Sequence, residues 1–257
     1  MLPVALTIAG SDPSGGAGIQ ADVKTFHRFG VYGEAAITLL TVQNTTCVTR
    51  VETLAPDLVI QQIEAVLSDI PPRAAKTGAL GNADVVRAVA EMAKAFEFPL
   101  IVDPVMVSKH GSRLLSGEAE QALKNNLIPR ASLATPNIPE AEVLAGMRIQ
   151  TEEDMRVAAM KMRDMGSRAV LIKGGHLAGA PIDLLDTGHD VHVFRAERIN
   201  TPHTHGTGCT YSAAITAGLA RGKSLVDAVS EAKAFVHRAI QEAPGFGHGH
   251  GPLNHFV

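Results

Sequence analysis

One short stretch decides how this chain is organised: THGTGCT, residues 204–210. It follows a polar run at 200–203 and opens a long apolar segment with helical periodicity, 211–220. The first N–H groups of a helix have no partner inside the helix, and small residues let an anion approach them closely. The helix dipole adds partial positive charge at the same end. The stretch therefore predicts an anion-binding helix N-terminus formed by Gly206, Thr207 and Gly208.

Cys209 stands in the first turn of this predicted helix. A helix N-terminus lowers the pKa of a thiol, so we expect Cys209 to be able to carry negative charge. One turn would then combine an anion cradle with a proton acceptor, which are the two groups that phosphoryl transfer to an alcohol needs. The simpler alternative is that Cys209 is a small buried residue at a helix start.

The rest of the chain alternates short β-rich runs with amphipathic helical patterns. Strands are expected at 2–9, 35–42, 74–78, 100–102, 133–135, 169–173 and 182–186. Helices are expected at 18–29, 56–68, 83–96, 117–126, 139–145, 152–165, 208–221 and 225–242. Such alternation predicts an α/β fold with a parallel sheet between helical layers. Right-handed crossovers then place the C-terminal strand ends at one edge of the sheet, where ligands bind.

Length and composition favour a cytoplasmic enzyme with one domain over 1–257. The chain has 257 residues, of which 46% are hydrophobic, enough for one sizeable core. Its net charge of −3 and the absence of a basic cluster argue against nucleic-acid and membrane-surface binding. Two cysteines are too few for a disulfide framework and indicate a reducing compartment. The N-terminus lacks the features of a signal peptide, and no apolar run approaches the roughly 18 residues of a membrane span.

Acidic and amide side chains follow two neighbouring strands of the predicted sheet. Asp103 comes directly after strand 100–102, and Asn137 and Glu140 follow strand 133–135. Carboxylates from adjacent strand ends suit a magnesium ion and its waters, so we expect a metal site at Asp103 and Glu140. The alternatives are a turn residue at Asp103 and a helix cap at Glu140.

Two further strand ends carry candidate binding groups. Lys173 ends an apolar strand beside two glycines and is expected to reach a phosphate oxygen as a point charge. Lys76 resembles it, although its side chain could simply extend along apolar surface. Gln43 offers a donor and an acceptor in one plane, which match the edge of an aminopyrimidine. Its alternative is a polar residue where a strand leaves the sheet.

Glycine-rich segments outside residues 204–210 raise other possibilities. The loop 10–18 lacks the GxxxxGK[ST] pattern, but residues 16–21 fit the GxGxxA dinucleotide fingerprint. That match is weak, because Gly16 lies several residues after the strand end and no acid follows the second strand. The match leaves a nicotinamide-dependent oxidoreductase as one rival function. A non-catalytic pyrimidine- or vitamin-binding protein is a second rival, independent of this match. The loop 108–113 is expected to close over a substrate. The Gly/His tail 247–252 is expected to be a terminal loop, with metal binding as its alternative.

Together these segments resemble the hydroxymethylpyrimidine/phosphomethylpyrimidine kinases of the ribokinase-like superfamily, over essentially the whole chain. The landmarks are AGSD (9–12), GGAGIQAD (15–22), VQN (42–44), KTG (76–78), VDPVM (102–106), TPN (135–137) with Glu140, KGGH (173–176) and HGTGC (205–209). The resemblance implies a three-layer α/β/α fold with a central mostly parallel sheet. It also implies ATP as phosphoryl donor, with magnesium, and a homodimer. The expected reactions convert 4-amino-5-hydroxymethyl-2-methylpyrimidine (HMP) to its phosphate and then to its diphosphate.

The resemblance also assigns roles by matching position. Substrate binding is expected at Gln43, Val42, Gly10 and Asp22, and the anion hole at 206–209. Cys209 stands where most relatives in the superfamily have an aspartate base. Magnesium is expected at Asp103 and Glu140, and the nucleotide at Asn137, Lys173 and Gly208.

One departure from the family pattern bears on the substrate. The family often has a methionine two residues after the threonine of KTG, whereas this chain has Ala79. Met106 is the candidate to fill that place. The departure keeps pyridoxal-type substrates open as an alternative.

Overall fold

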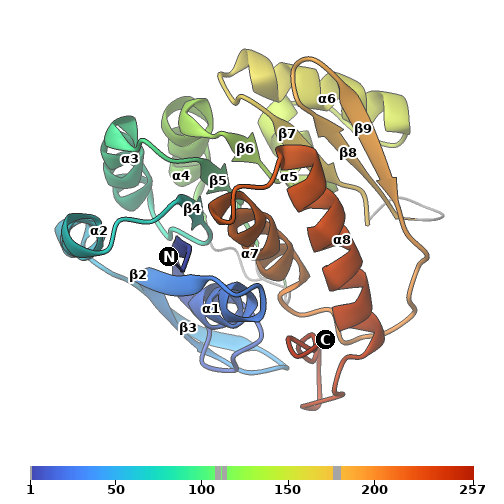
Figure 1. The fold of residues 1–257 in the computed structure, drawn as a ribbon, viewed down its shortest axis with the longest axis horizontal. Coiled ribbons are helices and arrows are strands. Elements are labelled where there is room, and N and C mark those ends of the chain that lie inside the picture. The colour runs from blue at the N-terminus through green and yellow to red at the C-terminus, as the bar shows by residue number, and fades with distance from the viewer. Residues whose placement is uncertain (1, 108–110, 112–114, 176–180) are drawn as a thin grey trace.

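The computed structural model describes residues 2–107, 111, 115–175 and 181–257, and its centre is one nine-stranded sheet (Figure 1). The strands follow the order β3-β2-β1-β4-β5-β6-β7-β8-β9 across the sheet. Neighbouring strands from β2 to β7 run parallel, while β3, β8 and β9 pair antiparallel with their neighbours. Their bounds are β1 (Val4–Ser11), β2 (Tyr32–Gln43), β3 (Val48–Thr53), β4 (Ala74–Thr77), β5 (Leu100–Val102), β6 (Leu133–Ala134), β7 (Val170–Lys173), β8 (Ile182–Asp186) and β9 (Val191–Arg195).

Helices cover both faces of this sheet. They are α1 (Gly18–Arg28), α2 (Pro56–Asp69), α3 (Ala83–Met92), α4 (Gly117–Ala122), α5 (Ile138–Ala145), α6 (Glu152–Asp164), α7 (Thr207–Ala220) and α8 (Leu225–Gln241). Short helical segments extend α3 (Ala93–Ala95) and α4 (Leu123–Leu127, Ile128–Arg130). Figure 1 shows α1, α7 and α8 on one side of the sheet and α2 to α6 on the other. This is the three-layer α/β/α fold that the sequence predicts.

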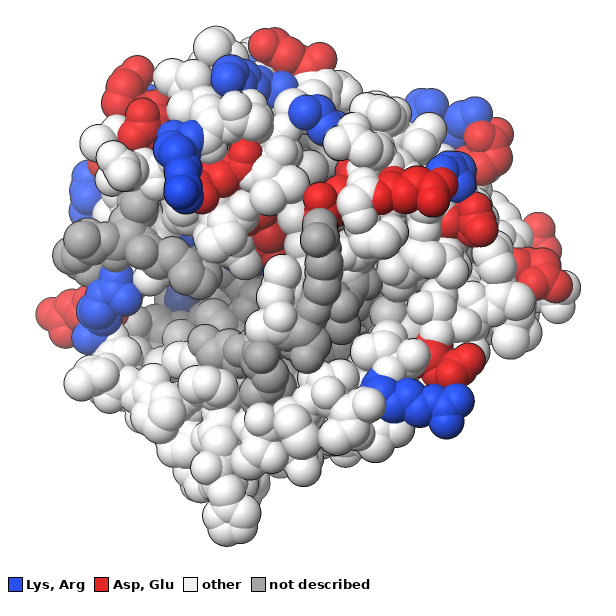
Figure 2. Space-filling view, turned by 180° about the vertical axis from the view of Figure 1, so that it is seen from behind, with Lys and Arg blue, Asp and Glu red and all other residues white. Residues whose placement is uncertain are grey.

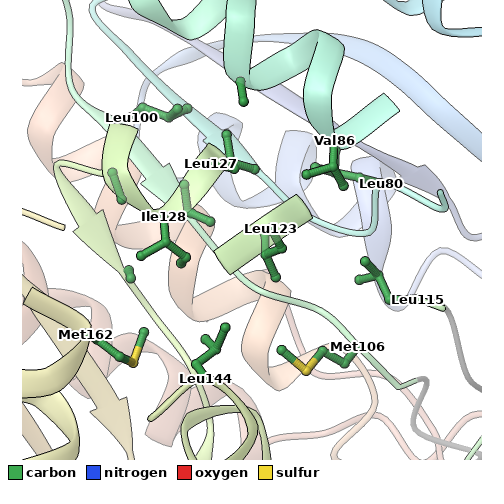
Figure 3. Close-up of a cluster of buried hydrophobic side chains, with 14 of the residues drawn as sticks. Leu80, Val86, Leu100, Met106, Leu115, Leu123, Leu127, Ile128, Leu144 and Met162 are labelled. Atoms are coloured by element: carbon green, nitrogen blue, oxygen red, sulfur yellow. The ribbon is translucent and has the colours of Figure 1, made fainter. Parts of the chain in front are cut away.

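Alternation along the strands divides the core between the two faces. In β5, Leu100 and Val102 belong to the cluster under α2 to α6, whereas Ile101 between them faces α7 and α8. Successive side chains of a strand point to opposite faces, so a strand covered on both sides is apolar throughout. Figure 3 shows part of the first cluster, in which Met106 lies among Leu115, Leu123 and Leu144.

The observed elements differ from the predicted ones mainly at the sheet edges. The sequence analysis missed β3 and β9, which are the two edge strands. Both have exposed positions along their length, so neither shows the apolar run of a buried strand. Strand β8 lies as predicted but runs antiparallel to β7. The helices begin within one residue of the predicted positions, and α3 and α4 end earlier than expected.

Charges of both signs are distributed over the visible surface of the molecule (Figure 2). Figure 2 shows acidic and basic side chains interspersed on one face of the molecule. A mixed surface lacks the extended positive potential with which proteins hold nucleic acid. No helix in the described ranges is long and apolar enough to cross a membrane.

Candidate active site

The site is built on the N-terminus of α7, where the chain turns sharply at Gly206. This residue has φ 80°, and a Cβ atom there would lie 1.8 Å from the carbonyl oxygen of Gly16. Only glycine adopts this conformation and permits this approach without strain. Gly206 thereby joins the THGTGCT stretch to the glycine loop after β1. The helix begins at Thr207, one residue before the predicted start.

The first turn of α7 points its N–H groups toward the edge of the sheet, except that the N–H of Thr207 donates to the carbonyl of Thr204 at 3.3 Å. No side-chain hydrogen bond from the described residues caps this N-terminus. A Cβ atom added to Gly208 would lie 3.2 Å from Lys173 Nζ and 3.9 Å from Asp103 Oδ2. The helix N-terminus, the lysine and the aspartate therefore converge, as the sequence analysis expected. Together they offer positive partial charges and one ammonium to an incoming anion.

Lys173 and Asp103 form an ion pair at the C-terminal ends of β7 and β5. Lys173 Nζ lies 2.9 Å from Asp103 Oδ1, and the hydroxyl groups of Thr135 and Ser212 donate to the same carboxylate. Burial favours the neutral amine of Lys173, but the charges of Asp103 and Glu140 outweigh it and raise the pKa. The lysine is therefore a fixed positive charge at the α7 N-terminus.

Asn137 and Glu140 form a capping box at the start of α5. The backbone N–H of Asn137 donates to Glu140 Oε2 at 2.9 Å, and the N–H of Glu140 donates to Asn137 Oδ1 at 3.0 Å. Burial raises the pKa of Glu140 to about 7; Lys173 opposes this rise and Asp103 adds to it. The capping role that the sequence analysis kept as an alternative is thus present. The backbone N–H of Met106 also donates to the Glu140 carboxylate, so this carboxylate is held by two backbone groups.

Asp103 and Glu140 suit a magnesium ion only if bound phosphate and water supply its remaining ligands. No group of three or more His, Cys, Asp and Glu side chains suited to a metal occurs among the described residues. Asp103 and Glu140 nevertheless act on each other electrostatically, and this surplus of negative charge contributes to the high pKa of Glu140. Magnesium in phosphoryl-transfer sites takes one or two carboxylates together with phosphate oxygens and waters. Two carboxylates near a phosphate site meet that requirement.

Cys209 lies in the first turn of α7, but its acidity is opposite to our expectation. The pKa of its thiol is raised to about 11, because burial disfavours the thiolate more than Lys76 and the N–H of Gly18 favour it. Asp22 and Asp103 raise the pKa further. The predicted lowering of the pKa was therefore wrong. The helix N-terminus acts on a thiol that its surroundings keep protonated.

Gln43 stands at the end of β2, close to the THGTGCT stretch. Its Nε2 atom lies 3.2 Å from Nε2 of His205, one residue before the α7 turn. Val42 beside it is exposed, so this strand end is accessible from solvent. Gly10, at the end of β1, is buried, and a Cβ there would lie 2.5 Å from Leu39 Cδ1. The structure thus brings Gln43 to the helix N-terminus and gives Gly10 a packing role.

Two predicted substrate residues lie in the interior instead. Asp22 is fully buried and accepts hydrogen bonds from Lys76 Nζ at 2.8 Å and Thr7 Oγ1 at 2.6 Å. Met106 is buried in the hydrophobic cluster of Figure 3. Neither side chain presents surface to a ligand, because ion pairing or packing covers it. The loop 108–113 lies outside the described residues except for Gly111.

Asp12 and the C-terminal segment belong to the site, although the sequence analysis gave them no role there. Asp12 Oδ2 lies 2.7 Å from His205 Nε2, and the backbone N–H of His205 donates to the carbonyl of Gly251. His205 and Pro252 pair as in a short parallel ladder. The tail contacts 44–46 as well, since His250 N donates to Thr45 O at 2.8 Å. The sequence contains one sign of this contact, namely the glycines of the tail. A Cβ atom on Gly247 or Gly249 would clash with Thr45, so only glycine lets the tail pack this closely.

A ribokinase-like sheet with the N-terminus of a helix and a lysine at its C-terminal edge indicates the class: a small-molecule kinase. The comparisons narrow this class, because the family model described as phosphomethylpyrimidine kinase matches residues 12–254. The chain belongs to the phosphomethylpyrimidine kinase family.

Individual relatives agree with this assignment. The hydroxymethylpyrimidine/phosphomethylpyrimidine kinase of Bacillus subtilis (strain 168) is 49% identical over 98% of this chain and 94% of its own length. The phosphomethylpyrimidine kinase structure from Clostridium difficile 630 has a TM-score of 0.84 at 44% identity and covers 93% of this chain and 99% of that one. The Staphylococcus aureus pyridoxal kinase in complex with AMP-PCP and pyridoxal has a TM-score of 0.92 at 38% identity, with 100% and 94% coverage. Vitamin kinases of two substrate types thus share this fold.

Proposed function

We propose that this protein uses ATP to phosphorylate HMP to HMP phosphate and then to HMP diphosphate, in thiamine biosynthesis. The observation that carries the proposal is the convergence of the α7 N-terminus, Lys173 and Asp103 at the strand edge where Gln43 also lies. The relatives named for these two reactions match nearly the whole chain. The amide of Gln43 matches the aminopyrimidine edge of HMP.

The transferring phosphoryl group would lie at the start of α7. In a loose transition state the protein's main task is to stabilise charge on the equatorial oxygens. The N–H groups of Gly206, Gly208 and Cys209 and the ammonium of Lys173 would serve this purpose, whereas the N–H of Thr207 donates to Thr204 and would have to leave it. Preorganised donors of this kind each contribute about 3–4 kcal/mol to lowering the barrier. Asn137 and Gly208 would contact the nucleotide beside Lys173.

Asp103 and Glu140 would hold the magnesium ion that accompanies ATP. Bound there, the ion would neutralise phosphate charge during transfer. Asp103 would remain paired with Lys173, and the Glu140 carboxylate would contact the ion while it still accepts from the N–H groups of Asn137 and Met106. A measurable consequence is that binding of magnesium and nucleotide together lowers the pKa of Glu140, since a cation favours the carboxylate.

Cys209 would accept or polarise the proton of the substrate hydroxyl group in the first phosphorylation. The second phosphorylation uses a phosphate oxygen that is largely ionised near neutral pH and needs no such help. Cys209→Ala should therefore slow the first reaction far more than the second. Single-turnover rates measured separately with HMP and HMP phosphate test this role. Equal losses for both would reduce Cys209 to a packing residue.

Competing acceptors test the proposed function directly. ADP release is measured with HMP, HMP phosphate and pyridoxal, each alone and in mixtures, with magnesium present. We expect both pyrimidines to be phosphorylated and to compete for one site. NADH binding without ADP release would indicate an oxidoreductase, and ligand binding that ignores ATP and magnesium would indicate a binding protein.

Pyridoxal phosphorylation is a second candidate activity, which the small side chain of Ala79 favours. Ala79 is small and half-buried, and Met106 is packed in the core, so neither side chain takes the place of the family's methionine. A related fold with pyridoxal bound supports the same possibility. We expect Ala79→Met to reduce kcat/KM for pyridoxal more than for HMP. An equal effect on both substrates would contradict a role of the side chain at position 79 in ring selection.

We also propose that the enzyme is a cytoplasmic homodimer. The free cysteines Cys47 and Cys209 fit a reducing compartment. Leu40 and Val42, two residues apart on β2, share one face of the strand and are exposed. A partner copy would cover this apolar surface. Light scattering on the wild type and on Leu40→Asp tests the dimer, and a monomeric wild type would refute it.

A further inference from the structure

Asp183 is a buried carboxylate on β8 that lies directly opposite Lys173 on β7. Residues opposite each other in an antiparallel pair point to the same face of the sheet, with Cβ atoms about 4.5–5.5 Å apart. Leu171 and Leu185, two positions along each strand, both pack under α7 and α8, so Lys173 and Asp183 share that face. A lysine side chain spans this separation. The register therefore offers Asp183 to Lys173 as an ion-pair partner.

Lys173 is nevertheless paired with another carboxylate. Its Nζ atom lies 2.9 Å from Asp103 Oδ1, beside the N-terminus of α7. Asp183 has its own cation, since Lys233 Nζ on α8 lies 2.6 Å from Asp183 Oδ2, with exposures of 15% and 4% for the two side chains. The backbone N–H of Gly174 donates to Asp183 Oδ1 at 3.1 Å. Both oxygens of Asp183 are thus satisfied without Lys173.

The backbone around Lys173 is held in place from both sides. Its N–H group donates to the carbonyl of Pro136 at 2.8 Å, in the segment after β6. A Cβ atom on Gly174 would lie 2.0 Å from the carbonyl oxygen of Ile182, so the end of β7 is pressed against β8. Only the side chain of Lys173 can therefore move from one carboxylate to the other.

We propose that Lys233 directs Lys173 to the N-terminus of α7 by occupying Asp183, which makes Lys233 a positioning residue for phosphoryl transfer. A carboxylate that already has a cation attracts a second one weakly, because the two cations repel each other. Without Lys233, Asp183 would keep one backbone donor, whereas Asp103 would still accept from two hydroxyl groups. The buried carboxylate with fewer donors is the costlier one to leave without a cation, so Lys173 would turn to Asp183. The inference rests on the proposed role of Lys173.

The first test measures kcat for HMP at saturating ATP in Lys233→Met, Asp183→Asn and the double variant. Lys233→Met should lose at least about tenfold, since Lys173 moves away from the transferring group. Asp183→Asn removes the competing charge, so this variant and the double variant should both stay within about threefold of the wild type. If Lys233 acted directly on a ligand, Asp183→Asn could not restore the loss. An unchanged kcat in Lys233→Met, or a loss that the double variant retains, would overturn the proposal.

Asp186 provides a matched control on the same strand. Its Oδ1 atom accepts from the backbone N–H of Gly188 at 2.8 Å and lies 3.3 Å from Arg163 Nη1. The residue opposite Asp186 on β7 is Val170, so loss of the cation can divert no lysine. Arg163→Met should therefore lower the free energy of unfolding while kcat stays within about threefold of the wild type. A fall in kcat as large as that of Lys233→Met would assign both losses to destabilisation and overturn the proposal.

A crystal structure of Lys233→Met, or of Lys233→Gln if the first variant does not fold, tests the proposal without an activity assay. We expect Nζ of Lys173 within hydrogen-bond distance of Asp183 and no longer beside Asp103. Lys173 still paired with Asp103 would overturn the proposal. A wild type that releases no ADP with HMP would instead refute the proposed function, and the crystal structure would still report which carboxylate pairs with Lys173.

Discussion

Two lysine–carboxylate pairs in this molecule have nearly the same geometry and opposite surroundings. Lys76 and Asp22 lie 2.8 Å apart with both side chains 0% exposed, beneath the C-terminal edge of the sheet. Lys173 and Asp103 lie 2.9 Å apart with exposures of 13% and 2%, at that edge. The first pair is closed off by the core, whereas the second borders the α7 N-terminus. Access to the sheet edge, and not the pairing itself, therefore separates a buried structural ion pair from one whose lysine can also reach a ligand.

The closed pair should give the largest effect on stability. Lys76→Met leaves the Asp22 carboxylate buried without a cation, so we expect the free energy of unfolding to fall by about 3–5 kcal/mol. Urea denaturation at neutral pH measures this loss. The double variant Lys76→Met/Asp22→Asn removes both charges and should recover most of it. A single variant as stable as the wild type would show that the pair is not what stabilises this part of the core.

The open pair should give the largest effect on catalysis. Lys173→Met removes one preorganised positive charge from the phosphate site, and we expect kcat for HMP to fall about 10²–10³-fold. Stability should fall by only about 1–2 kcal/mol, since Thr135 and Ser212 still donate to Asp103. Steady-state ADP release and urea denaturation on the same preparation separate the two effects. If the free energy of unfolding falls as much in Lys173→Met as in Lys76→Met, the proposed difference between the two pairs is wrong.

Cys209 lies where the two pairs meet, because Lys76, Asp22 and Asp103 all act on its thiol. Its pKa of about 11 means that the thiolate is scarce near neutral pH. If the thiolate is the base, the first-step rate should rise about tenfold per pH unit up to about pH 9, since the thiolate fraction does so. Rapid-quench measurements with HMP follow this rise. Cys209→Ala should remove it, and a flat wild-type profile would indicate that the neutral thiol only polarises the hydroxyl group.

Glu34 provides a buried carboxylate that has no cation beside it. Burial, with a smaller contribution from Asp69, raises its pKa from 4.5 to about 7, and its Oε2 atom has no hydrogen-bond partner among the described residues. A carboxyl group with a raised pKa contributes its full stability below the unfolded pKa, and this is lost as pH rises through about 7. Glu34→Gln should therefore raise the free energy of unfolding by about 1–3 kcal/mol near pH 8. Urea denaturation near pH 8 and near pH 5 should show the gain mainly at the higher pH. Equal gains at both values would contradict the titration of Glu34.

The periodicity of short segments was enough to predict most helices and strands. It also predicted which residues lie at the C-terminal edge of the sheet around the start of α7. The glycines at 206 and 208, the lysine ending β7 and the acid ending β5 each follow an element whose periodicity is visible in the sequence. Parallel strands then bring them to one edge without further information. The edge strands β3 and β9 were missed because strands at the margin of a sheet have no continuous apolar run.

Contacts between distant segments account for what could not be predicted. Asp22 was assigned to the substrate, but its partner Lys76 is 54 positions away and draws it into the core. The contact between Asp12 and His205 joins residues 193 positions apart. The acidity of Cys209 was misjudged for a related reason: the helix N-terminus is a local feature, whereas the burial that opposes it comes from β1, β4 and α1 packed against α7.

The position of the C-terminal segment has a consequence for how the protein becomes active in the cell. A ribosome that has released the first 245 residues has delivered every strand of the sheet and both helices α7 and α8. The backbone of Gly251 and Pro252, which pairs with the backbone of His205, is still missing at that moment. The nascent chain can therefore assemble its scaffold before the substrate pocket is complete. Catalysis should therefore begin only after residues 251–252 have left the ribosome and paired with His205.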